Sequence, residues 1–227
     1  MPVIVMCSTK GGVGKSTAAL VLAQVFAAAK SSVTLIDADP NQPLATWKKR
    51  FEKSVPDNLK VVGGVNEETI VNEIDTAAEQ DPFVIVDLEG SANVTASYAI
   101  SRADLVLIPM RGKQLDADQA GRVVALIERE SKAFRRKIPY RVMFSMMSVL
   151  QSREQKHIRK TLETRGIPIL NAAMMERAAY SAIFQLGGTI FDLSKDDVSN
   201  PRAAQEDAQA LASAVVNTLK QEQAEAA

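Results

Sequence analysis

The chain has 227 residues and a mass of 24.6 kDa, a length that fits one generous domain with a sizeable core. Its 27 Lys and Arg residues balance 27 Asp and Glu residues, so attraction to nucleic acid or anionic lipid must come from a local patch rather than from net charge. The single cysteine, Cys7, excludes a disulfide within the chain and suits a reducing compartment, so we expect a cytoplasmic protein. The apolar run at the N-terminus is short and has no basic leader, and no stretch approaches about 18 consecutive apolar residues, so we expect neither a signal peptide nor a membrane span.

Short apolar runs alternate with longer helical patterns along the chain. In chain order, the runs predict strands at 3–6, 33–36, 83–86, 105–108, 140–144 and 167–170. The patterns between and after them predict helices over 15–29, 116–134, 152–164 and 201–227, with fraying expected over 218–227. Because the runs are almost continuously apolar, each strand should be buried on both faces. The alternation therefore predicts one α/β domain over 1–227, with a doubly wound, mostly parallel sheet and helices on both faces.

A glycine-rich loop joins the first predicted strand to the first predicted helix. Glycines let the backbone point its N–H groups at a phosphate, and the start of a helix adds partial positive charge. We expect Lys15 to hold the β and γ phosphates and the Ser16 hydroxyl to coordinate Mg²⁺. The common pattern GxxxxGK[ST] requires glycine at position 9, where this chain has Thr9 followed by Lys10. The loop is therefore a variant P-loop.

The string KGGVGKST resembles the deviant Walker A motif of the ParA/MinD family of ATPases. The resemblance implies a P-loop NTPase fold, ATP and Mg²⁺ as ligands, and a homodimer formed with ATP, in which Lys10 reaches the phosphates bound by the other subunit. A second cation near the γ phosphate stabilises charge in the transition state, as an arginine finger does. The implied catalytic residues are Lys10, Lys15 and Asp39. The implied nucleotide-binding residues are Lys10, Gly11, Gly12, Val13, Gly14, Lys15, Ser16, Thr17 and Gly90.

Acidic residues follow two further predicted strands. Asp37 and Asp39 stand in the string DADP, which resembles the family's DxDP element and implies a metal-side role for Asp37 and a water-positioning role for Asp39. Capping of the turn before Pro40 is the alternative for either acid alone. Asp87 ends the string FVIVD, which is typical of a Walker B acid that holds Mg²⁺. The expected metal-side residues are thus Ser16, Asp37 and Asp87.

The string after Asp87 departs from the family pattern. The family usually has D-x-P-P here, whereas this chain has Leu88, Glu89 and Gly90. Glu89 places a negative charge near a polyanion, and an ATP-locked structural dimer that does not hydrolyse ATP therefore stays an alternative function. We expect the Gly90 N–H to contact the γ phosphate, which would make this segment a nucleotide-sensing switch.

Basic residues are concentrated between positions 129 and 165. This span holds 11 Lys and Arg residues against 3 Glu residues, an excess of 11 − 3 = +8 in a chain that is neutral overall. Such an excess predicts a surface that binds DNA phosphates without sequence preference. The alternative is a set of solvated side chains that never gather in space. The candidate DNA-binding residues are Arg135, Arg136, Lys137, Lys156, Arg159 and Lys160.

Taken together, the motifs and the resemblance predict a short ParA-type ATPase that partitions DNA and associates with the nucleoid. Such enzymes are slow and are stimulated by a centromere-binding (ParB-like) or adaptor protein. Positioning of a DNA-transfer complex, or of a cargo other than DNA, stays open. Membrane attachment of the MinD kind is disfavoured because the tail LKQEQAEAA is polar and acidic. Electron transfer of the nitrogenase-reductase kind would need two cysteines per subunit, and metallochaperone GTPases would carry histidine or cysteine clusters.

Overall fold

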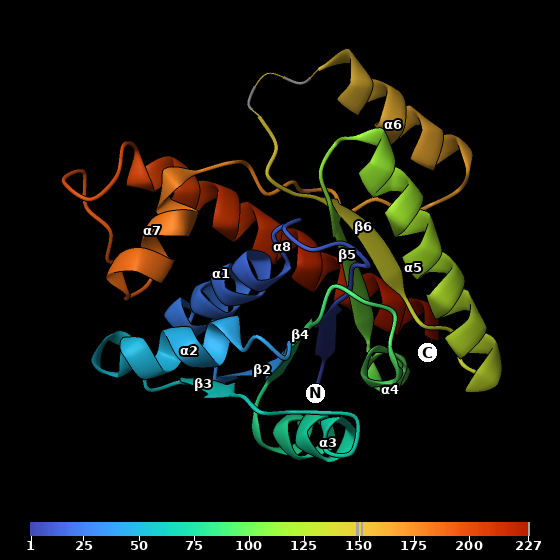
Figure 1. The fold of residues 1–227 in the computed structure, drawn as a ribbon, viewed down its shortest axis with the longest axis horizontal. Coiled ribbons are helices and arrows are strands. Elements are labelled where there is room, and N and C mark those ends of the chain that lie inside the picture. Colours follow the sequence, from blue (N-terminus) through green and yellow to red (C-terminus); the bar gives the residue numbers. More distant parts are fainter. Residues whose placement is uncertain (149, 151, 227) are drawn as a thin grey trace.

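The computed structural model describes residues 1–148, 150 and 152–226 and has one sheet at its centre (Figure 1). All paired strands run parallel, in the order β3-β2-β4-β1-β5-β6. The strands are β1 Val3–Met6, β2 Val33–Ala38, β3 Leu59–Val62, β4 Phe83–Leu88, β5 Leu105–Met110 and β6 Tyr140–Phe144. The predicted parallel α/β architecture is confirmed.

Helices cover both faces of this sheet (Figure 1). The helices are α1 Lys15–Ala28, α2 Pro43–Arg50, α3 Ile70–Gln80, α4 Val94–Arg102, α5 Gln114–Ala133, α6 Arg153–Thr164, α7 Ala178–Leu186 and α8 Pro201–Ala226, with a 3-10 turn at Glu52–Ser54. One core lies between the sheet and α1, α2, α7 and α8, and a second lies between the sheet and α3, α4, α5 and α6. None of the helices in the described part of the chain is long and apolar enough to cross a membrane.

Successive residues of a strand point to opposite faces of the sheet and so belong in turn to the two cores. On β1, Ile4 and Met6 belong to the core under α1, whereas Val3 and Val5 belong to the core under α4 and α5. A strand with helices on both sides is buried on both faces, which is why the β1 sequence shows no alternation of polar and apolar residues. The predicted burial of the strands on both faces is confirmed for β1, β2 and β5, where every residue is buried.

The strand predictions failed at two places. The segment 167–170 forms no strand: its contact with β6 is an isolated bridge between Ile169 and Val142. Pro168 has no N–H to donate, and only its carbonyl takes part, accepting from the Val142 N–H at 2.9 Å. The second failure is β3, which was not predicted, a four-residue edge strand in which Lys60 is exposed between the buried Leu59 and Val61.

Candidate functional site

The parallel sheet brings the carboxyl ends of β1, β2 and β4 together. In the strand register Asp87 of β4 lies opposite both Met6 of β1 and Asp37 of β2. The loop that follows β1 therefore starts beside these two acids. Ligands of open α/β sheets bind at this edge, outside the carboxyl ends of the strands.

The glycine-rich loop leads directly into α1. Gly12 and Gly14 have φ angles of 69° and 87°, in the left-handed region that glycine tolerates best. Gly14 is the N-cap of α1, and its carbonyl accepts from the Ala18 N–H at 2.9 Å. The remaining N–H groups of the first turn have no partner within the helix, so they are available to an anion. Lys15, the first residue of α1, is buried.

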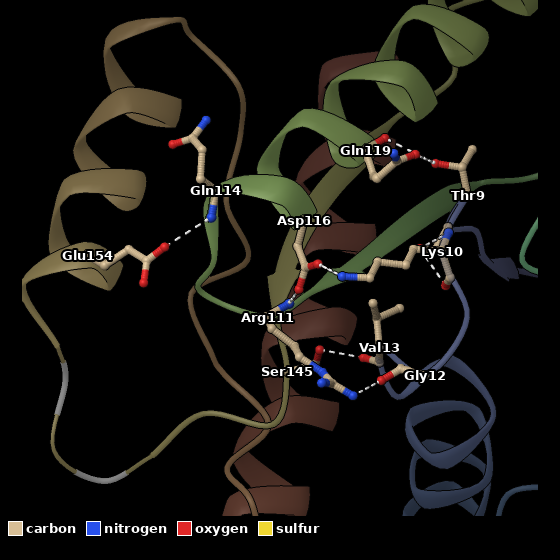
Figure 2. Close-up of polar contacts among 11 residues, drawn as sticks. Thr9, Lys10, Gly12, Val13, Arg111, Gln114, Asp116, Gln119, Ser145 and Glu154 are labelled. Carbon is tan, nitrogen blue, oxygen red and sulfur yellow. Dashed lines mark hydrogen bonds and ion pairs between the residues drawn. The ribbon is translucent and has the colours of Figure 1, made fainter.

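A pocket of about 470 Å³ lies at this helix start. It brings together most of the predicted nucleotide-binding residues with the predicted water-side acid, Asp39. The residues that line it are Gly11, Gly12, Gly14, Lys15, Ser16, Thr17, Asp39, Asn41, Glu89 and Gly90. Val13 is buried and lies outside this lining, and its carbonyl accepts a hydrogen bond from the Ser145 hydroxyl at 2.6 Å (Figure 2).

Gly90 lies against the backbone of the loop after β1. A Cβ at this position would lie 3.1 Å from the Gly11 amide nitrogen and 3.3 Å from the Lys10 carbonyl carbon. Both neighbours are backbone atoms that cannot rotate away, so any larger residue would require the two loops to move apart by a few tenths of an ångström. The segment after β4 and the glycine-rich loop are therefore in direct contact.

Asp87 is the acid of this site whose carboxylate oxygens are free to bind a cation. Its side chain is fully buried, and neither carboxylate oxygen accepts a hydrogen bond from the described residues. Burial raises the pKa of Asp87 to about 7. The Ser16 hydroxyl, which lies near the carboxylate without meeting hydrogen-bond geometry, and the charge of Lys15 oppose that rise. A buried carboxylate without a partner is costly, and a divalent cation would supply the missing positive charge. Together with the phosphate loop, this donor set fits a phosphate chain bound with Mg²⁺.

Asp37 uses its carboxylate to fix a helix. Its Oδ2 accepts from the N–H groups of Leu44 at 2.8 Å and Ala45 at 2.9 Å, in the first turn of α2. Burial raises the pKa of Asp37, and these backbone hydrogen bonds oppose the rise. The acid thus positions α2 and lies beside Asp87, and its predicted contact with a metal stays a prediction.

Two other acids line the pocket itself. Asp39 Oδ1 accepts from the backbone N–H of Asn41 at 2.8 Å and from its side-chain amide at 3.0 Å, which fixes the carboxylate at the pocket wall. Glu89 Oε2 accepts from the Ser91 hydroxyl at 2.8 Å and from the Asn93 amide at 3.0 Å. The chain therefore holds two carboxylates at the rim of one pocket, in addition to the buried Asp87.

Lys10 does not line this pocket. Its Nζ lies 2.5 Å from Asp116 Oδ1, in the first turn of α5 (Figure 2). Arg111, just after β5, donates its backbone N–H to Asp116 Oδ2 at 3.2 Å and a guanidinium N–H to the Gly12 carbonyl. Neither Asp116 nor Arg111 was predicted from the sequence as a site residue. An acid in the first turn of a helix is common because its charge interacts favourably with the helix dipole. No local signal in the sequence therefore distinguishes Asp116 from other acids at helix starts.

The candidate DNA-binding residues separate into two groups. Arg135, Arg136 and Lys137 follow α5 and line a pocket of about 740 Å³ that contains no α6 residue. Arg136 donates to the Ala103 carbonyl, and Lys137 pairs with acids of α8, Glu222 and Glu225. The second group lies on α6, which Figure 1 shows beside the start of α5, at the other end of that helix.

The α6 group is more open to solvent. Lys156 and Lys160 are exposed, and Arg153 lies one turn before Lys156, so these three residues share one side of the helix. Arg159 is half-buried, with its guanidinium 4.8 Å from the centre of the Phe144 ring. Ser152 caps α6 in a capping box with Gln155, which fixes where this basic surface begins.

Comparisons with known proteins identify relatives of the chain and proteins of the same fold. The family model described as VirC1 protein matches residues 1–221. The chain is 43% identical to the protein named ParA of Rhizobium radiobacter over 220 residues, which cover 96% of this chain and 98% of that one. Among solved structures, the MinD cell division protein of Aquifex aeolicus matches with a TM-score of 0.72 at 20% identity, over 96% of this chain and 98% of that chain. The McdA(D38A)-ATP complex of Cyanothece matches with a TM-score of 0.71 at 17% identity, over 92% of this chain and 96% of that chain. These two structures support the fold.

Proposed function

The chain belongs to the VirC1 protein family, and from this premise we propose that it is a ParA/MinD-type ATPase that forms a dimer with Mg-ATP and separates after hydrolysis. One observation carries the proposal: the pocket at the start of α1 lies beside a buried acid, Asp87, whose two oxygens have no partner among the described residues. The helix start supplies N–H donors for phosphate, and Asp87 supplies charge for a cation. A solved structure of this fold with bound ATP gives further support.

Binding rests on the backbone of residues 11–17 and on the side chains of Lys15, Ser16 and Asp87, with Asp37 beside them. The N–H groups of the loop and of the first turn of α1 surround the phosphates, and Lys15 places its ammonium against them. Ser16 and Asp87 would hold Mg²⁺, and Asp37 keeps its predicted place on the metal side. The ion would supply positive charge that neutralises the phosphates and polarises the terminal phosphoryl group. The Gly90 N–H contacts the γ phosphate, so the segment after β4 responds to the nucleotide.

Hydrolysis needs a water molecule held in line with the terminal phosphate. Asp39 is fixed at the pocket wall by Asn41, which leaves Oδ2 to orient that water and to take its proton. Lys10 of each subunit leaves its own Asp116 and stabilises charge on the phosphates of the other subunit. Without this second lysine the site is incomplete, which makes the dimer the active form.

The dimer binds DNA through the exposed basic side of α6. Arg153, Lys156 and Lys160 lie three and four residues apart, and their long side chains reach a phosphate backbone without reading bases. Arg135, Arg136 and Lys137 are the second predicted group, but internal contacts of Arg136 and Lys137 compete with phosphate. We therefore place the main DNA contact on α6.

The partition of DNA is the role we assign to this cycle. A relative named ParA that covers nearly the whole chain at 43% identity supports it. A centromere-binding or adaptor protein on the cargo stimulates hydrolysis, and DNA binding by the dimer keeps the protein on the nucleoid in the cytoplasm. Hydrolysis then releases monomers from the DNA.

Light scattering with ATP, ADP or no nucleotide tests the proposal. We expect wild type to form a dimer only with ATP and Mg²⁺, and Lys10→Ala to stay monomeric under the same conditions. Lys49→Ala removes an exposed lysine on α2 and serves as the matched control, with wild-type behaviour expected. If wild type binds ATP and stays monomeric, the dimer cycle is wrong. If Lys10→Ala forms the dimer as wild type does, the role of Lys10 across the interface is wrong.

A further inference from the structure

The lysine that distinguishes this P-loop is paired inside its own subunit. Lys10 Nζ and Asp116 Oδ1 are 2.5 Å apart, and the Asp116 side chain is 1% exposed whereas the Lys10 side chain is 41% exposed (Figure 2). The flexible, half-open member of the pair is thus the lysine, and the fixed, buried member is the aspartate. Lys10 can leave, and Asp116 cannot follow it.

The surroundings of Asp116 hold it in place when Lys10 moves. Its second oxygen, Oδ2, accepts from the Arg111 N–H at 3.2 Å. One turn further along α5, Gln119 Oε1 accepts from the Thr9 hydroxyl at 2.7 Å. Asp116 and Gln119 thus contact two consecutive residues of the loop from one side of α5. The Thr9 contact fixes the backbone ahead of Lys10, so release of the ion pair moves the lysine side chain and leaves the loop attached.

We propose that Asp116 is a positioning residue that holds Lys10 within its own subunit and thereby makes dimer formation depend on the γ phosphate. The dependence on dimer formation rests on the proposed function, whereas the hold on Lys10 in the single subunit does not. Removing Lys10 leaves a buried carboxylate without its counter-charge, which is costly in a low-dielectric setting. The transfer of Lys10 is favourable only when its new site offers more negative charge than Asp116 does.

The charge of the nucleotide then decides whether Lys10 stays paired with Asp116 in the monomer or moves to the phosphates of the other subunit in the dimer. A ligand shifts an equilibrium only by the difference in its interaction with the two states. ATP carries one more phosphate than ADP at the end of the chain that Lys10 of the other subunit approaches, so ATP compensates for the loss of the Asp116 pair and ADP does not. The guanidinium of Arg111 donates to the Gly12 carbonyl, whereas only the backbone N–H of Arg111 contacts Asp116.

Asp116→Asn tests the inference, because it removes the charge and keeps an oxygen that accepts from the Arg111 N–H. Asp118→Asn is the matched control, since Asp118 is an exposed acid on the same helix. The first readout is acylation of Lys10 by an amine-specific reagent in nucleotide-free protein, followed by mass spectrometry. We expect Lys10 to react several-fold faster in Asp116→Asn than in wild type and in the control. Equal rates in all three proteins would overturn the inference.

The second readout is light scattering during titration with ATP and with ADP. We expect Asp116→Asn to dimerise at an ATP concentration about tenfold lower than wild type, or to dimerise with ADP as well. If wild type dimerises with ATP and Asp116→Asn has the same threshold and the same selectivity, the inference is wrong while the proposed function stands. If wild type stays monomeric with ATP bound, the proposed dimer and the threshold both fail, and the acylation rates alone decide whether Asp116 holds Lys10. Asp116→Ser removes the charge without added bulk and replaces Asp116→Asn should that variant misfold.

Discussion

Replacing Asp87 by asparagine should stabilise the protein at alkaline pH when Mg²⁺ and nucleotide are removed. The Asp87 carboxyl is fully buried and accepts no hydrogen bond from the described residues. Its pKa is raised from 3.8 to about 7, chiefly by burial. The folded protein at pH 8 therefore contains an ionised group in a site that disfavours ionisation, and Asp87→Asn removes that charge at almost the same volume.

The sign and the size of the effect follow from the two pKa values. Below about pH 4 the carboxyl is protonated in both the folded and the unfolded chain, so Asp87 costs nothing extra. Between about pH 4 and pH 7 only the unfolded chain ionises, so the free energy of unfolding falls as pH rises, and above pH 7 the full cost is present. The pKa values differ by about three, and one pKa unit corresponds to about 1.4 kcal/mol, so the cost approaches about 4 kcal/mol. We expect Asp87→Asn to recover about 2–4 kcal/mol at pH 8.

Urea unfolding at a series of pH values between 5 and 8.5, in the presence of EDTA, measures this directly. The difference in unfolding free energy between Asp87→Asn and wild type should grow with pH and level off above about pH 7. Asp57→Asn, which changes an exposed acid before β3, should show no such trend. A gain that does not vary with pH, or a loss of stability at pH 8, would refute the reasoning. With Mg-ATP present the order should reverse, because the wild-type charge then pairs with the cation.

Three further predictions concern the nucleotide pocket and the basic surface. Gly90→Ala should weaken ATP binding at least about tenfold, measured by calorimetry, because its Cβ would force the Gly11 backbone away. Glu89→Gln should tighten ATP binding several-fold in the same assay, because it removes a negative charge beside the phosphates and keeps an oxygen for Ser91 and Asn93. Lys156→Ala with Lys160→Ala should weaken DNA binding by the ATP form and lower the slope of log K against log salt by about one for each DNA phosphate that the variant no longer neutralises.

The controls for these predictions use the same kinds of residue elsewhere. A Cβ at Gly121 in α5 would meet nothing within 4 Å, so Gly121→Ala should leave ATP affinity unchanged and raise stability by about 0.5–1 kcal/mol. Lys49→Ala should leave the salt slope of DNA binding unchanged. Unaltered ATP affinity in Gly90→Ala would contradict the close approach of the two loops, and weaker binding by Glu89→Gln would show that Glu89 contributes to the site. An unchanged salt slope in the α6 double variant would move the DNA-binding surface to another part of the molecule.

The features of the site that the sequence predicted are those encoded by neighbouring residues. The glycines of the loop, Lys15 and Ser16 stand within a few positions of each other, and the backbone conformation they need is itself local. Asp87 was predictable because it ends an apolar run, and a parallel sheet places strand ends at one edge. Neither prediction requires knowledge of which helix packs against which.

The features that could not be predicted from the sequence depend on distant contacts. Asp116 is 106 positions away from Lys10, and only the packing of α5 beside the loop after β1 brings the two together. The count of basic residues between 129 and 165 did not separate the surface formed by residues 135–137 from the surface on α6, because that separation also depends on how distant elements pack. It summed charges along the chain, whereas β6 leads away from the end of α5 and α6 begins beside the other end of that helix, where Glu154 accepts from the Gln114 N–H at 3.2 Å (Figure 2). The wrong strand at 167–170 has a local cause instead, because Pro168 stands inside the apolar run and lacks the N–H that a ladder needs.

This division between local and distant contacts corresponds to two different properties of the proposed switch. The P-loop provides affinity for a phosphate chain, and a loop of this kind binds ATP and ADP through the same backbone groups. Selectivity for ATP must therefore come from interactions that differ between the two nucleotides. The proposed Gly90 contact with the γ phosphate is one of them, and selectivity increases further where such an interaction replaces another one when it forms. The Lys10 ammonium has that property because its alternative partner, Asp116, lies in the same subunit and is buried. A ParA/MinD-type loop without such a partner would keep its affinity for nucleotide. Its lysine would then cross to a second subunit with lower selectivity for ATP over ADP.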